Sequence, residues 1–208
     1  MKKKGLALIL ALVLVTVSLV SGTMAWLTAQ TDPLTNTFMD SDINITLTES
    51  TSDYKMIPGH TITKDPMVTV DANSEPCYLF VQVTEDLGAW ADNDPDMSFG
   101  DYLSYSVAGA WTALDGVADV YYMVVEDPAE APEKGYPVLT GNAVLVSGEN
   151  VTKEMMDEVD GDDEEKPTLT FKAYAVQLYT GAINEGKKVA FTPAEAWSKA
   201  SALNNPGT

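Results

Sequence analysis

Short segments in which apolar and polar residues alternate constrain this chain more than any other feature. The longest is TLTFKAYAVQLYT, residues 168–180. A period of two residues is typical of a half-buried β-strand, here with Leu169, Phe171, Ala173 and Ala175 on one face and Thr170, Lys172, Tyr174 and Val176 on the other. Comparable segments are INITLT (43–48), YLSYSV (102–107), VADVYYMVV (117–125) and the doubly apolar CYLFVQVTE (77–85). The series predicts one all-β domain of about eight to ten strands in two packed sheets.

Glycine and proline residues mark the expected turns. Pro58-Gly59 predicts a turn, because glycine can supply the positive φ that such a turn needs. Pro66 cannot donate to a strand ladder, so we expect it at an edge, a bulge or a strand start. In YPVLTGNAVLV (136–146) we expect two short strands about Thr140-Gly141-Asn142.

Two short helices are predicted, over residues 151–159 and 192–203. The second is the better supported, since Thr192 and Glu195 form a capping box with Pro193 at the first helical position. Residues 157–166, DEVDGDDEEK, are expected to form an acidic, solvated loop.

The first 25 residues have the pattern of a secretory signal. Three Lys precede an uncharged run from Gly5 to Val20. Thr23 and Ala25 are small residues at both key positions before a cut, the third and the first residue on its N-terminal side. We expect cleavage between Ala25 and Trp26, with a weaker second site after Ala29. The alternative is a retained membrane anchor, since residues 5–27 reach the length of a spanning helix. The expected organisation is a signal peptide at 1–25, an N-terminal segment at 26–42 and a β-sandwich at 43–208.

The charge balance excludes one class of partner. All twelve basic residues are Lys, and loss of the first 25 residues changes the formal charge from −19 to −22. Such a polyanion repels phosphate backbones and lacks the planar guanidinium that binds phosphate in a bidentate manner. We therefore expect no binding of nucleic acid.

The scarcity of Cys and His restricts the available chemistry. Cys77 is the only cysteine, which rules out an intramolecular disulfide, and its apolar surroundings in sequence predict a buried thiol. His60 is the only histidine, it follows a turn, and an exposed ring is expected. A zinc site or a Ser-His-Asp triad would have to use it, so no enzyme is predicted. A pair of carboxylates, as in glycosidases, stays open but is uninformative among 31 acidic residues.

One acidic segment is a weak candidate for calcium. Asp92, Asp94 and Asp96 occupy alternate positions, but the match to an EF-hand loop fails at its sixth and twelfth positions, which are Met97 and Leu103. An irregular calcium loop is the remaining alternative to a plain acidic loop, and no other cofactor is expected.

Three blocks, taken together, resemble a known family. SGTMAWLTAQTDPLTNTFMDSDINITL contains Gly22, Thr23 and Ala25 followed by Trp26-Leu27, then Asn36 and Phe38, then a strand. MIPGHTITKDPMVTVDANSEPCYLFVQV has a Pro58-Gly59 turn with Lys64, and LTFKAYAVQ is a late strand. In order and spacing they are similar to the TasA/camelysin family of exported Gram-positive proteins, whose signals are cut by a dedicated signal peptidase of the SipW type.

The resemblance implies a jelly-roll-like two-sheet sandwich that is secreted to the extracellular matrix or cell surface and polymerises with itself into biofilm fibres. It also implies that the freed N-terminal segment acts as a donor strand in the next subunit. Strand addition of this kind combines backbone pairing with side chains that fill pockets. The side chains expected to be buried there are Trp26, Leu27, Leu34 and Phe38. The membrane would be contacted only through an uncleaved signal segment.

Two other functions stay open on the sequence alone. The first is a secreted or cell-surface binding module for glycans or host surfaces that uses loops around Trp90 and Trp111, although large aromatic residues more often belong to sandwich cores. The second is a hydrolase, which the single His60 disfavours. The casein-cleaving activity for which some members of the family are named is not expected here.

Overall fold

The computed structural model describes residues 42–51, 54–92, 94–132, 135–158 and 166–202, all within one compact unit. In these ranges the chain forms twelve β-strands, three α-helices and two 3-10 helices. Every strand pair is antiparallel. The protein is therefore all-β with few helices, as predicted, but its described ranges contain twelve strands in four sheets instead of eight to ten strands in two. Within the same ranges no helix has the length and apolar character needed to cross a membrane.

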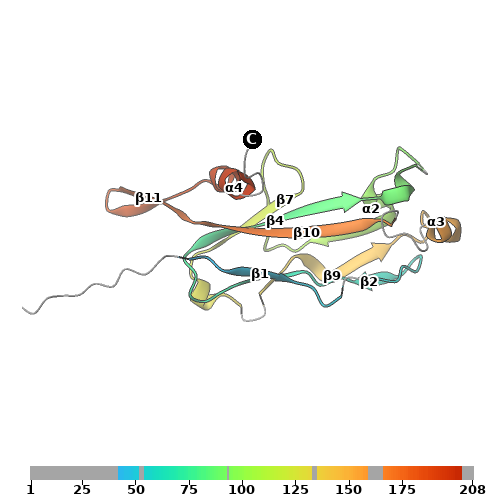
Figure 1. Ribbon diagram of the computed structural model, residues 1–208, viewed down its shortest axis with the longest axis horizontal. Helices are drawn as coiled ribbons and strands as arrows, with labels where there is room; N and C mark the ends of the chain where they lie inside the picture. The colour runs from blue at the N-terminus through green and yellow to red at the C-terminus, as the bar shows by residue number, and fades with distance from the viewer. Residues whose placement is uncertain (1–41, 52–53, 93, 133–134, 159–165, 203–208) are drawn as a thin grey trace, which may run out of the picture. The chain divides into compact units, whose positions relative to one another are not determined.

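One layer is a four-stranded sheet with the order β10-β4-β7-β6 (Figure 1). β4 (Cys77–Asp86) and β10 (Thr168–Gln177) pair along all ten residues. β7 (Val120–Val125) pairs with the other edge of β4, and β6 (Thr112–Ala113) pairs with β7. β4 is thus an inner strand and is buried on both faces over its first five residues, as its apolar sequence predicts.

The opposite layer is built from two three-stranded sheets that follow one another. The first is β1-β3-β8, with β1 at Ile45–Thr48, β3 at Met67–Val70 and β8 at Tyr136–Pro137. The second is β2-β9-β5, with β2 at Thr61–Thr63, β9 at Leu139–Val146 and β5 at Leu103–Val107. The Lys64 N–H donates to the Asn142 carbonyl (2.9 Å) and the Val138 N–H to the Pro66 carbonyl (2.9 Å). These bonds join the two sheets into one interrupted layer, so the arrangement is sandwich-like.

Alternate side chains of β4 define the cores on its two faces. The core between the layers consists of Val68, Val70, Cys77, Leu79, Val81, Val83, Trp111, Val125 and Val138. Tyr78 and Phe80 point the other way, where α4 (Pro193–Ala202) covers them with Ala196 and Ala200. A third cluster, around Trp90, closes the end of the unit beside α3 (Lys153–Glu158). β10 has the alternation predicted for it, since Leu169, Phe171, Ala173 and Ala175 pack toward the first core while Tyr174 and Val176 pack toward the second.

Several local predictions are confirmed. Gly59 has φ +75° in a turn closed by the His60 N–H and the Ile57 carbonyl (3.0 Å). Pro66 directly precedes β3, at a strand start. α3 and α4 lie within the predicted helical ranges, and in α4 the Thr192 N–H donates to Glu195 (2.8 Å) while the Glu195 N–H donates to the Thr192 hydroxyl (3.3 Å).

Other local predictions are wrong. Residues 139–146 form the single strand β9, in which Gly141 (φ +65°) and Asn142 (φ +51°) are accommodated without a turn. The strand expected to reach Thr180 ends at Gln177, and a separate hairpin of β11 (Tyr179–Asn184) and β12 (Lys187–Ala190) follows. The chain also contains helices that were not expected, namely α2 (Phe99–Tyr102), η1 (Gly88–Asp92) and η2 (Pro128–Glu130).

Candidate strand-acceptor edge

β10 is the longest strand with an unpaired side. β4 occupies one side of β10, and no strand within the described residues pairs with the other. The outward N–H and C=O groups of an edge strand can template pairing with a further strand, and natural proteins usually shorten, charge or cover such edges. This edge is ten residues long and carries a single charged residue, Lys172. It is therefore the part of the fold best suited to accept another strand.

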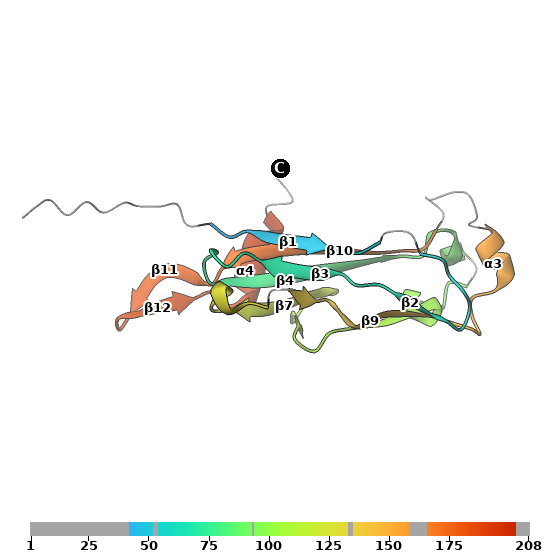
Figure 2. The same ribbon diagram turned by 90° about the horizontal axis from the view of Figure 1, so that it is seen from below.

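Apolar side chains beneath this edge are only partly buried. β10 contributes Leu169, Phe171, Ala173 and Ala175. β1 contributes Ile45 and Leu47, and Ile43 lies two residues before that strand. β1 lies beside β10 where the two layers meet (Figure 2), but the two strands are not paired with each other. On both strands these inward-facing side chains stay partly exposed, and we call them the apolar seam. One further strand laid along the seam would cover them.

A hollow of about 450 Å³ opens at one end of the seam. Ile43 borders it on the β1 side, Ala175 and Gln177 on the β10 side, and Phe191 and Lys199 on the side of α4. Its only charged lining residue is the Lys199 cation, so an apolar segment with acidic residues suits it better than a basic one.

The chain enters the unit at this same end. The Glu75 N–H donates to the Asp42 carbonyl (3.1 Å), and the Asn44 N–H donates to the Ser74 hydroxyl (3.0 Å). Close by in sequence, the Leu178 N–H donates to the Pro76 carbonyl (2.8 Å), where β10 has ended. Asp42 and the hollow therefore lie at the same end of the unit, the end that contains Cys77 and Gln177.

The residues predicted for signal cleavage and strand donation, Ala25, Trp26, Leu27, Leu34 and Phe38, lie outside the described residues, and their roles stay predictions. So do most of the residues of the expected acidic loop. The structure therefore describes the proposed acceptor but not the proposed donor.

The calcium candidates lie on one exposed loop. Asp92, Asp94 and Asp96 are all exposed, and Asp94 Oδ1 accepts the Asp96 N–H (3.0 Å). Among the described residues no group of three or more His, Cys, Asp or Glu is placed to hold a metal ion. The geometry adds no support for calcium, which stays a prediction.

Both tryptophans considered for ligand binding belong to the core. Trp90 is fully buried and donates its indole N–H to the Met155 carbonyl (3.0 Å). Trp111 is 6% exposed and donates to the Pro137 carbonyl (2.8 Å). Neither ring presents a face on which a sugar could stack, so core packing, the interpretation that the sequence favoured, is confirmed, and the alternative of a binding surface built on these two rings is wrong.

Cys77 and His60 behave as predicted. Cys77 is fully buried, and burial raises the pKa of its thiol to about 11, so it is protonated and unreactive at neutral pH. His60 is exposed, with its Nδ1 3.1 Å from the Pro58 carbonyl oxygen.

A second hollow, of about 550 Å³, lies between β5 and β7. Glu85, Tyr105, Trp111, Asp119 and Tyr121 contribute to its lining. The Tyr105 hydroxyl donates to Glu85 (2.6 Å); desolvation of the phenol and this bond raise the pKa of Tyr105 well above its ordinary value. No short motif predicts the pair, because twenty residues separate its members.

Lys64 is a further residue whose role the sequence did not show. It is the one buried charged residue in the described part of the chain, and its Nζ lies 2.9 Å from Glu49. The same ammonium stands 4.8 Å from the Tyr54 ring centroid and 5.5 Å from that of Phe171, on β10. In sequence, Lys64 was noted only because it follows the Pro58-Gly59 turn. Its partners Glu49, Tyr54 and Phe171 are brought together only by the fold.

No family model, curated protein or solved structure matches this chain. The resemblance to the TasA/camelysin family therefore stays a prediction.

Proposed function

We propose that the mature chain is a secreted, non-enzymatic structural subunit, released after cleavage at Ala25, that polymerises into extracellular matrix fibres of a Gram-positive bacterium. In this proposal the domain is a jelly-roll-like sandwich, and residues 26–38 of one copy pair with the outer edge of β10 in the next copy. The observation that carries the proposal is that no described strand pairs with the outer edge of the ten-residue strand β10, which lies above partly buried apolar side chains.

The N-terminal segment fits this edge in length. Residues 26–41 number sixteen, and an extended strand rises ~3.3 Å per residue, so the segment spans ~50 Å against ~33 Å for ten residues of β10. Trp26, Leu27, Leu34 and Phe38 supply the apolar side chains for the seam. Pro33 interrupts the ladder, so pairing divides on either side of it.

Charge favours β10 over the free edge of β5, the five-residue edge strand of another sheet. Residues 26–41 contain Asp32 and Asp40 and no Lys. The hollow beside β5 carries the carboxylates of Glu85 and Asp119, whereas the hollow beside β10 carries only Lys199. Like charges brought together in a closed site repel, so β5 is the poorer acceptor for this segment.

Removal of the segment is expected to abolish assembly. Protein that begins at Trp26 should form fibres visible by electron microscopy, and protein that begins at Asp42 should sediment as a folded monomer. Leu34→Asn with Phe38→Asn should behave like the truncation, while the matched control Thr35→Asn with Thr37→Asn should assemble normally. Identical fibres from the truncated protein would contradict strand donation. A concentration-independent monomer from the complete mature chain would mean that the segment folds back on its own copy.

The hollow between β5 and β7 favours a second candidate, a cell-surface binding module. Its tyrosine rings and carboxylates, with the hydroxyls of Ser104 and Ser106, are groups that bind sugars. An oligosaccharide that binds the truncated monomer, but not its Tyr121→Ala variant, would favour this function over the structural one.

A further inference from the structure

The β11–β12 hairpin gains little from either core. Its two strands pair only with each other, and every residue from Gly181 to Lys188 is exposed. Ile183 is 74% exposed, the most of any large apolar side chain in the described ranges. An isolated two-stranded hairpin is only marginally stable in water. A partner that covers its exposed apolar side chain would remove that side chain from water and so stabilise the hairpin. The hairpin is therefore a candidate contact surface.

Basic residues slightly outnumber acidic ones in the hairpin and α4. Residues 178–202 contain three Lys and two Glu in a chain of formal charge −19. Lys188 Nζ stands 5.1 Å from the Tyr179 ring centroid, and Lys199 Nζ stands 5.1 Å from that of Phe191. The loops beside the start of β4 are acidic and carry Asp42, Asp71 and Glu75.

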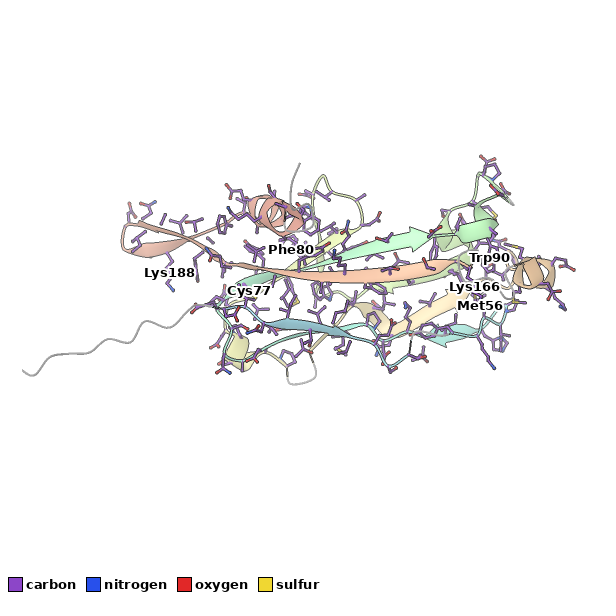
Figure 3. The ribbon with its side chains drawn as sticks, in the orientation of Figure 1. Met56, Cys77, Phe80, Trp90, Lys166 and Lys188 are labelled. Carbon is purple, nitrogen blue, oxygen red and sulfur yellow. The ribbon has the colours of Figure 1, made fainter. Side chains whose placement is uncertain are left out.

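The opposite end of the unit is strongly acidic. Residues 85–101 contain six acidic residues and no Lys. β10 connects the two ends, because its first residue pairs with Asp86 and its last residue, which pairs with Cys77, precedes the hairpin. Figure 1 shows the hairpin and α3 beyond opposite ends of β10, and Figure 3 shows Lys188 and Trp90 at these two ends.

We propose that the hairpin of one copy docks on the acidic end of the next copy, with Lys187 and Lys188 facing Asp92, Asp94 and Asp96. This inference rests on the proposed function, and adds the second contact of the assembly. A contact between opposite ends is heterologous and does not close into a dimer, so it generates an open, polar array. Lysines placed against these carboxylates also offset the repulsion between copies that each carry a large negative charge.

The contact agrees with the direction of strand donation. Asp42, from which the N-terminal segment leaves, lies at the same end of the unit as the base of the hairpin, as the bonds from Glu75 to Asp42 and from Leu178 to Pro76 show. The donor segment and the hairpin of one copy therefore reach the same neighbour.

Charge reversal tests the contact in the complete mature chain. Lys187→Glu with Lys188→Glu should raise the protein concentration needed for assembly by about tenfold or more, as measured by sedimentation. The reason is that attraction between two lysines and the facing carboxylates becomes repulsion, and a tenfold change corresponds to ~1.4 kcal/mol. Asp92→Lys with Asp94→Lys should impair assembly similarly. An equimolar mixture of the two variants should assemble like wild type, since each hairpin then meets an end of opposite charge.

The outcomes separate this inference from the proposed function. If truncation to Asp42 abolishes fibres but the Lys187/Lys188 variant assembles like wild type, strand donation stands and the hairpin contact is overturned. Failure of the mixture to recover assembly would overturn it as well. Inorganic polyphosphate that binds wild type but not the variant, with assembly unchanged, would assign the two lysines to a polyanion instead.

Discussion

Trp90→Ala is expected to lower the free energy of unfolding by about 4 kcal/mol, the range for loss of a large aromatic side chain from a core. Trp90 is fully buried, and its ring centroid lies 5.7 Å from that of Tyr102. The substitution removes the buried ring, leaves a cavity, and deprives the Met155 carbonyl of its 3.0 Å donor. Because Met155 belongs to α3, the helix should also lose its attachment to this end of the unit. Urea denaturation followed by circular dichroism measures the change.

Trp197→Ala is the matched control. Trp197 is only partly buried, at 5.4 Å from Phe80 and 5.3 Å from Tyr174 between ring centroids. Its loss removes less buried area, and we expect a cost of about 2 kcal/mol. Equal costs for the two substitutions, or a cost below about 1 kcal/mol for Trp90→Ala, would contradict the burial of Trp90 described here.

Loss of Glu49 is expected to cost more stability than loss of Lys64. Glu49→Ala leaves a lysine that is 11% exposed without its anionic partner, whereas Lys64→Met keeps the apolar stem against Tyr54 and Phe171 and leaves a carboxylate that is 24% exposed. The Tyr54 hydroxyl also continues to donate to Glu49 (2.9 Å). Breaking a fully buried pair costs 3–5 kcal/mol, and partial exposure reduces this to about 2–3 kcal/mol for Glu49→Ala and about 1 kcal/mol for Lys64→Met.

The double variant distinguishes a true pair from two independent effects. Glu49→Ala with Lys64→Met should cost at least ~1 kcal/mol less than the sum of the single changes, because neither charge is then left alone. Chemical denaturation of the four proteins in one buffer measures this coupling. Additive costs would show that the 2.9 Å contact contributes no pairwise stabilisation.

Predictions from local pattern succeeded where one strand alone determines the outcome. The alternation in residues 168–177 is a property of the strand itself, and it correctly assigns side chains to the two faces of β10. The capping box at Thr192 and Glu195 is equally local. Such features depend on the period of the backbone and on hydrogen bonds between near neighbours.

The errors occurred where a partner in another part of the chain decides. β10 ends at Gln177 because its partner β4 begins at Cys77, after which the Leu178 N–H donates to Pro76 and the chain enters the hairpin. The hairpin has a local signal that was missed, since Glu185 and Gly186 both have positive φ between the paired residues Asn184 and Lys187. β9 continues through Gly141 because the Asn142 carbonyl accepts from Lys64, and because Val138, directly before the strand, donates to Pro66.

The candidate site could be predicted only in part for the same reason. The proposed donor segment could be suggested from sequence because a run such as Trp26-Leu27 is too apolar for an idle tail. The acceptor could not, because a free edge depends on which strands pair and which do not. Sequence favoured the core for Trp90 and Trp111 but left a binding surface open, and the packing shows that both are buried.

Hydrogen–deuterium exchange on β10 tests the central claim most directly. A synthetic peptide of residues 26–41 is added to protein that begins at Asp42, and exchange is followed by mass spectrometry in fragments from β10 and from β5, a second edge strand. Strand addition to β10 predicts slower exchange over residues 168–177, because outward amides acquire partners, and no change over residues 103–107. Protection of β5 with β10 unchanged, or no protection at either edge, would contradict the account.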